Sequence, residues 1–83
     1  MVEYKVEVII CDAKQETSKT STPYRTEAAA RTAYKSRNLA VIAKNLKRVT
    51  FVGKRLVRIH SDQTEQLLAS DAYGKNPGVA EKF

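Results

Sequence analysis

The 83-residue chain contains one cysteine, one histidine and no tryptophan, and these shortages limit the chemistry that it can perform. With Cys11 alone the chain forms no internal disulfide, although secreted domains of this size usually depend on several. Its three glycines, Gly53, Gly74 and Gly78, form neither a phosphate-binding loop nor a dinucleotide-binding motif. Metal-binding spacings of cysteine, histidine and aspartate are also absent. We therefore expect a non-enzymatic protein that uses no cofactor or metal.

Long apolar runs are absent as well. The longest ones, residues 8–11 and 39–43, are far shorter than the roughly 20 residues that a membrane-spanning helix needs. The chain also does not open with a basic segment followed by an apolar run, as a signal peptide would. We therefore expect a soluble cytoplasmic protein that does not bind membranes.

Acidic side chains are missing from the middle of the chain. Residues 25–58 hold ten lysine or arginine residues and a single acid, Glu27, so this segment carries a charge of +9. The other residues carry −3, and no carboxylate side chain lies between Glu27 and Asp62. The net charge of +6 therefore conceals one strongly basic block. Such a block keeps a small protein soluble or binds an anionic partner, and its lack of acids favours the second interpretation.

The first 22 residues carry the signals of two strands. Apolar residues at every second position alternate with mainly charged ones: Val2, Tyr4, Val6, Val8 and Ile10 against Glu3, Lys5, Glu7 and Ile9. This period of two predicts a half-buried strand with a charged outer face. Residues 12–15 predict a turn, and the polar residues 16–22 predict a second, exposed strand paired back on the first. We expect Pro23 to end that strand.

A helix is predicted over residues 27–37. Thr26 is a suitable N-cap, and Glu27 lies in the first turn, where the helix dipole favours an acid. The alanines of this segment favour helix, and Asn38 tolerates the conformation that ends one. Residues 39–46 have apolar residues at helical spacing, although Val41 and Ile42 also suit an extended chain. We favour a short helical turn that leads into the next strand.

The second half of the chain predicts a hairpin followed by a helix. Residues 47–52 and 54–60 are rich in β-branched residues, and Gly53 between them suits a tight turn. Ser61 or Asp62 can cap a last helix that ends at Gly74. The apolar stripe of that helix would consist of Leu67, Leu68, Ala72 and Tyr73. The predicted fold is α+β: an antiparallel sheet of three to four strands (β-β-α-β-β-α order) with helices packed on one face. Residues 1–73 would form the single domain, and residues 74–83 a mobile tail.

The candidate functional surface is the basic hairpin with the neighbouring helix. Lysine and arginine side chains on a two-stranded ribbon can follow a phosphate backbone. The candidate binding residues are Lys44, Lys47, Arg48, Lys54, Arg55 and Arg58, with Arg31, Lys35 and Arg37 from the helix. Tyr34 and Phe51 are the only aromatic residues in the basic block, and both fit a core better than a base-stacking site. The favoured function is a binding module for nucleic acid or a nucleoprotein complex.

The alanine-rich helix with basic residues resembles that of double-stranded-RNA-binding domains, but the match fails at the end of the domain. That family has a basic motif at the start of its last helix. Here the corresponding segment, residues 62–65, reads Asp-Gln-Thr-Glu and would repel phosphate. We therefore reject this family.

The layout of the chain resembles that of small accessory proteins of phages and mobile elements, including anti-CRISPR proteins. The shared features are an early strand, a compact alanine-rich helix at residues 26–33 and a short hairpin at residues 49–59. This resemblance implies an alternative function, inhibition of a host defence or nucleic-acid-processing protein in the host cytoplasm. A basic inhibitor would bind an acidic protein surface or the nucleic acid itself. We also consider a homodimer formed through the exposed strand at residues 16–22.

Overall fold

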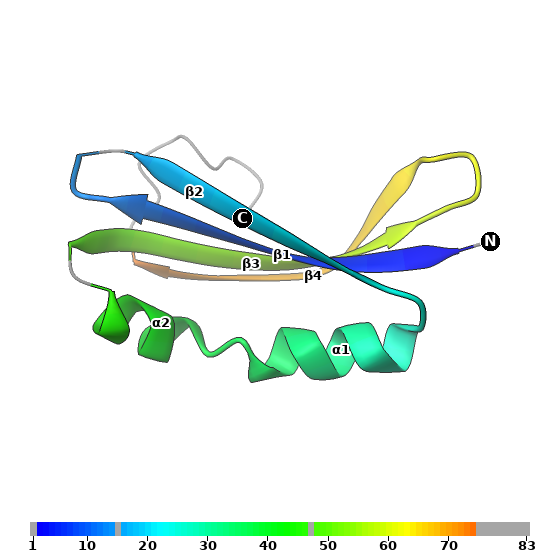
Figure 1. The fold of residues 1–83 in the computed structure, drawn as a ribbon, viewed down its shortest axis with the longest axis horizontal. Coiled ribbons are helices and arrows are strands. Elements are labelled where there is room, and N and C mark those ends of the chain that lie inside the picture. The colour runs from blue at the N-terminus through cyan, green and yellow to red at the C-terminus, as the bar shows by residue number, and fades with distance from the viewer. Residues whose placement is uncertain (1, 15, 47, 75–83) are drawn as a thin grey trace.

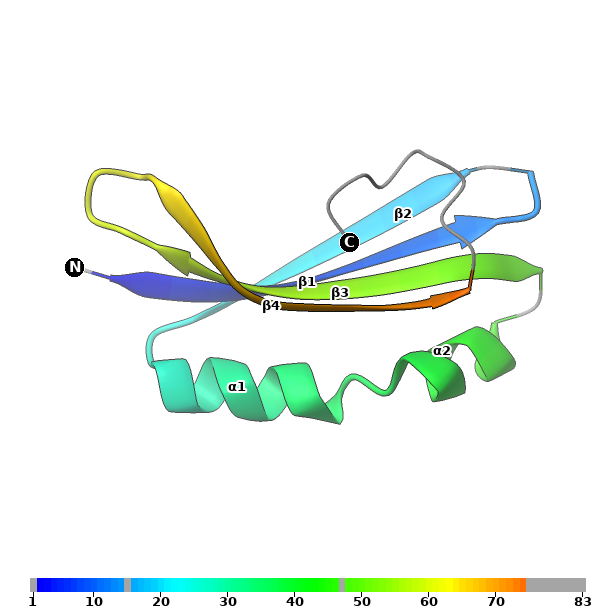
Figure 2. The ribbon, with the colours of Figure 1, turned by 180° about the vertical axis from the view of Figure 1, so that it is seen from behind.

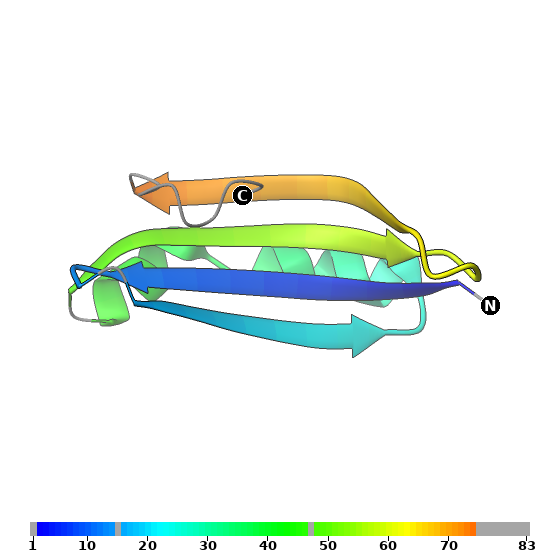
Figure 3. The same cartoon turned by 90° about the horizontal axis from the view of Figure 1, so that it is seen from above.

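The computed structural model describes residues 2–14, 16–46 and 48–74 and confirms an α+β architecture. A four-stranded antiparallel sheet, in the order β2-β1-β3-β4, carries two helices on one face (Figures 1 and 2). The helices lie end to end along the long axis of the sheet, as Figure 3 shows from above. In chain order the elements are β1 (Glu3–Asp12), β2 (Thr17–Tyr24), α1 (Glu27–Ser36), α2 (Leu39–Asn45), β3 (Val49–Ile59) and β4 (Glu65–Gly74). The predicted order of elements is wrong, because the second helix precedes β3 and the chain's last described element is a strand.

Strands β1 and β2 form the predicted hairpin. The side chain of Asp12 accepts hydrogen bonds from the backbone N–H groups of Lys14 (2.9 Å) and Glu16 (3.0 Å), which holds the turn. The prediction that Pro23 ends the second strand is wrong, since β2 continues to Tyr24 and Pro23 pairs with Lys5. Proline is compatible with this position because β2 is an edge strand, where a residue that cannot donate a backbone hydrogen bond loses nothing if it faces solvent.

The two helices begin at residues whose side chains cap them. Thr26 accepts a hydrogen bond from the backbone of Ala29 (3.2 Å), as predicted, and α1 ends with Arg37 as its C-cap. Asn38 follows, and its side chain accepts from the backbone of Val41 (3.2 Å). Asn38 therefore starts α2. The prediction that it ends α1 in a left-handed conformation is wrong, since Arg37 is the C-cap and Asn38 is extended with a φ of −81°. The short helical segment predicted over residues 39–46 is confirmed as α2.

The predicted hairpin around Gly53 is wrong, since β3 runs without interruption from Val49 to Ile59. Gly53 lies in the middle of the strand, where it pairs with Ile9 of β1 and Ala72 of β4. A glycine between two β-branched segments fits a hairpin turn and a close-packed strand interior equally well. In this protein the strands on both sides of β3 provide hydrogen-bond partners for an extended chain. The extended conformation at Gly53 is therefore favoured over a hairpin turn.

The predicted last helix is also wrong, because residues 65–74 form β4. The expected cap, Asp62, instead stabilises a turn in which its carboxylate accepts from the backbone of Thr64 (3.0 Å). Gln63 adopts a positive φ of 71°, and the His60 N–H donates to the Thr64 carbonyl (2.9 Å). This turn reverses the chain onto β3. Pairing along the exposed edge of β3 outweighs the weak helix preference of this segment. The tail predicted beyond Gly74 lies outside the described residues.

The core lies mainly between the sheet and the helices. Val6 and Leu56 pack with Ala30 and Tyr34 of α1, and a second cluster around Val8, Leu39 and Val52 lies beneath α2. A third cluster, Ile9, Cys11 and Phe51, belongs to alternate strand positions, on the other side of the sheet. We call that side the helix-free face, because neither α1 nor α2 covers it (Figure 1). Within the described parts of the chain, neither helix is long and apolar enough to cross a membrane.

Candidate functional site

The structure divides the predicted basic surface into side chains bound inside the fold and side chains left in solvent. Successive residues of β3 point to opposite faces of the sheet, so Lys54 and Arg58 face the helices whereas Arg55 faces away. A flat basic ribbon therefore does not form at residues 48–58. Lys47 lies outside the described residues.

Lys54 is buried, with only 9% of its surface exposed. Its ammonium group donates to the backbone carbonyl of Tyr34 (2.8 Å) and lies 4.2 Å from the centre of the Tyr34 ring. Because that carbonyl belongs to the last turn of α1, the cation also lies at the negative end of the helix dipole. Lys54 therefore fastens α1 to the sheet and is not available to a partner.

Arg55 lies on the helix-free face beside a carboxylate that is 1% exposed, that of Glu7. Its guanidinium donates to this carboxylate through Nε (2.7 Å) and through a second nitrogen, Nη2. The Glu7 carboxylate also lies near two lysine ammonium groups, that of Lys19 at 2.9 Å and that of Lys5 at 3.6 Å. Burial opposes ionisation, but the hydrogen bonds from Lys19 and Arg55 and the positive charges of Arg55 and Lys5 outweigh it. The pKa of Glu7 is therefore below its ordinary value.

Arg58 is held on the helix side of the sheet by Glu27. Its guanidinium contacts one carboxylate oxygen of Glu27 (2.6 Å), while Arg31 donates to the other from the next turn of α1 (2.8 Å). Arg58 also lies 5.5 Å from the centre of the Tyr4 ring. Hydrogen bonds from Arg31 and Arg58 lower the pKa of Glu27 despite some desolvation. This one acid of the basic block thus ties α1 to β3 and partly neutralises two arginines.

The remaining predicted residues lie on the helix layer and at its end. We call the set Arg31, Lys35, Arg37 and Lys44 the helix-layer basic face. Arg31, Lys35 and Lys44 are exposed and Arg37 is partly exposed at the junction of the helices. Among the described residues, Lys35, Arg37 and Lys44 have no ion-pair partner. Arg48, also exposed, lies beyond α2 beside the β1–β2 turn, where its carbonyl accepts from Ala13 (2.8 Å).

Besides the burial of Lys54, sequence reasoning missed two further polar groups that the fold buries, the Glu7 carboxylate and the Tyr34 hydroxyl. Glu7 follows the alternation of β1 and was predicted to face solvent, but lysine and arginine side chains from β1, β2 and β3 enclose it. Tyr34 donates from its hydroxyl to Asp71 of β4, which the sequence predicts to lie on a helix. Burial and this carboxylate raise the pKa of Tyr34. The Glu7–Arg55 and Tyr34–Asp71 contacts each join residues far apart in the sequence, so no local spacing of residues predicts them.

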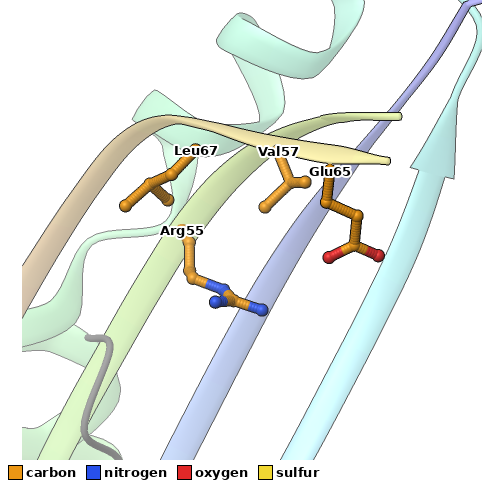
Figure 4. A pocket seen from close by; sticks show the side chains of 4 residues that line it. All are labelled: Arg55, Val57, Glu65 and Leu67. Carbon is orange, nitrogen blue, oxygen red and sulfur yellow. The ribbon is translucent and has the colours of Figure 1, made fainter. Parts of the chain in front are cut away.

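The pocket shown in Figure 4 lies on the helix-free face between β3 and β4. Arg55, Val57, Glu65 and Leu67 line it, with a volume of about 370 Å³. Glu65 is engaged with Lys5 at 2.8 Å. Among the described residues, no three histidine, cysteine, aspartate or glutamate side chains gather where a metal ion could bind.

The fold and these contacts define a small two-layer α+β protein. Among its described residues, the helix layer holds the unpaired cations Lys35, Arg37 and Lys44, and further unpaired cations lie outside it at Lys14, Arg25 and Arg48. The comparisons add no relative: no family model matches the chain, and no curated protein or solved structure is significantly similar to it.

Proposed function

We propose that the protein is a non-enzymatic module that binds nucleic acid, or a nucleoprotein complex, through the helix-layer basic face. The observation that carries this proposal is the contrast between two groups of cations. Lys54, Arg55 and Arg58 are bound within the fold, whereas Lys35, Arg37 and Lys44 are free of carboxylate partners among the described residues. These unpaired cations make no ion pair that stabilises the described part of the fold, and phosphate groups could bind to them without any displacement of internal ion pairs.

The arrangement of the helices supports a partner that is long and regularly charged. Helices α1 and α2 lie end to end (Figure 2), so their exposed cations are spread along the molecule and do not converge on one point. The large buried aromatic of the layer, Tyr34, is only 8% exposed and cannot stack on a base. These features favour contacts to a phosphate backbone over base-specific recognition.

The test is binding to duplex DNA and duplex RNA at several salt concentrations, measured by fluorescence anisotropy. For duplex DNA, each phosphate contact contributes about −0.9 to the slope of log affinity against log salt. Lys35→Gln and Lys44→Gln should each reduce the steepness of the slope by about one contact. Lys19→Gln removes the same charge from the opposite face of the sheet and should leave the slope unchanged. Equal effects of all three substitutions, or no binding at low salt, would refute the proposal.

A second candidate function is inhibition of a host protein that handles nucleic acid. One observation favours it: Val41 and Leu46, at and beside α2, are 50% and 42% exposed next to Lys44. Exposed apolar residues beside a cation are typical of protein interfaces, where buried apolar anchors supply most of the binding energy. In that case Val41→Ser should weaken partner binding more than Lys44→Gln does, and nuclease treatment should leave the complex intact.

A further inference from the structure

Strand β4 differs from every other element in charge. It is the one described helix or strand whose sequence, EQLLASDAYG, contains no lysine or arginine. Its two carboxylates are already engaged, Glu65 with Lys5 at 2.8 Å and Asp71 with the hydroxyl of Tyr34. Two copies of a chain with a charge of +6 repel each other most strongly where their cations meet. The approach through β4 therefore meets the least repulsion.

The same strand offers unpaired backbone groups. Among the described strands, β4 is at the end of the strand order and pairs only with β3, over the register from Ile59–Glu65 to Phe51–Gly74. Its ten residues correspond to about 33 Å of extended chain. Leu67 and Tyr73 on this strand are each 51% exposed. A long exposed edge with large apolar side chains is a template for another strand.

The opposite edge is less suited to pairing. β2 contains Pro23, which has no N–H to donate, and Lys19, a charged residue of the kind that discourages association at an edge. Its other residues are mainly serine and threonine, which bring little apolar surface to an interface. Pairing through the opposite edge strand, β4, is therefore more favourable than the homodimer that we expected from the sequence through residues 16–22.

We propose that β4 pairs antiparallel with β4 of a second copy of this chain to form one continuous eight-stranded sheet. Directly opposed residues of an antiparallel pair point to the same side, so the helices of both copies would cover the same face. The two helix-layer basic faces would then be on the same face of the eight-stranded sheet. The dimer follows from the charge and exposure of β4 and holds whether or not the protein binds nucleic acid.

The test is sedimentation equilibrium of the full chain from micromolar to near-millimolar concentration. Edge pairing buries less surface than a permanent dimer needs, so the mass should rise with concentration from 9.3 kDa toward twice that value. Leu67→Lys and Ser70→Lys place a cation on the edge and should weaken the dimer at least tenfold. Thr20→Lys adds the same charge to an exposed position on β2 and should leave it unchanged. Circular dichroism establishes that each variant is folded.

Three results would overturn the proposal: a wild-type monomer at every concentration, a dimer lost only in Thr20→Lys, or masses that grow beyond the dimer. A measurement on the wild-type chain serves if the β4 variants fail to fold. Amide hydrogen exchange over residues 66–73 should slow as protein concentration rises, and exchange independent of concentration would contradict pairing through β4.

Discussion

Replacing Glu7 by glutamine should destabilise the fold more than any other single charge removal on the sheet. The carboxylate is 1% exposed and accepts from Arg55 and Lys19, with Lys5 also within 4.0 Å. Glutamine keeps the shape of the side chain but leaves three cations close together without the anion that holds them. Removing one partner of a fully buried ion pair typically costs about 3–5 kcal/mol.

The expected loss lies at or below the lower limit of that range because the cations are unequally buried. Arg55 and Lys5 are 15% and 18% exposed, whereas Lys19 is 50% exposed and can turn toward water. We therefore expect a loss of about 2–3 kcal/mol at neutral pH, since the most exposed pair contributes little. For a domain of this size, such a loss lowers the melting temperature by roughly 10–20 °C.

The assay is urea unfolding of the wild-type chain and of Glu7→Gln between neutral and acid pH. Because the pKa of Glu7 in the folded protein lies below its ordinary value of 4.5, its stabilising contribution is complete above pH 4.5. The contribution is lost as the pH falls through the folded-state pKa, so the difference between the two proteins should shrink in acid. Glu65→Gln, a control at a carboxylate 47% exposed, should cost less than about 1 kcal/mol. Equal stability of Glu7→Gln and the wild type at neutral pH would refute the reasoning.

Two further predictions concern the end of β4 and the buried thiol. Gly74 has a φ of +89°, and a Cβ there would lie 2.3 Å from the backbone oxygen of Thr50, so Gly74→Ala should cost about 1–3 kcal/mol in urea unfolding. An unchanged midpoint would show that this end of the strand shifts freely. Cys11 is 0% exposed, and burial, with a smaller effect of the Asp12 charge, raises the pKa of its thiol. Native protein at pH 8 should therefore react with a thiol reagent only as fast as it opens, and reaction at the rate of the urea-unfolded chain would contradict this.

The elements with strong local signals were predictable. The alternation of Val6, Val8 and Ile10 with polar neighbours specified β1, and the Thr26 cap with its alanine-rich continuation specified α1. Both signals depend on side chains a few residues apart, which the sequence displays directly. The +9 charge of residues 25–58 was equally visible, although its distribution in space was not.

The second half of the chain shows why the remainder was not predictable. Gly53 and residues 65–74 have no decisive local preference, and their conformation follows from the strands that lie beside them. A central strand gains hydrogen bonds on both sides, so β3 stays extended through its glycine, and β3 in turn templates β4. These stabilising hydrogen bonds involve residues far away in the sequence, so the local conformational propensity of a segment does not predict them.

The sequence by itself determined the basic block, the first strand and the capped helix, because each is a property of neighbouring residues. Only the tertiary structure decided which cations remain available. The alternation of β3 sends Lys54 into the core, Arg55 to Glu7 and Arg58 to Glu27, whereas Lys35, Arg37 and Lys44 on the helix layer keep no ion-pair partner among the described residues. A side chain's partner is set by the face and the neighbouring strand that the fold gives it, and a charge count along the chain does not include that information.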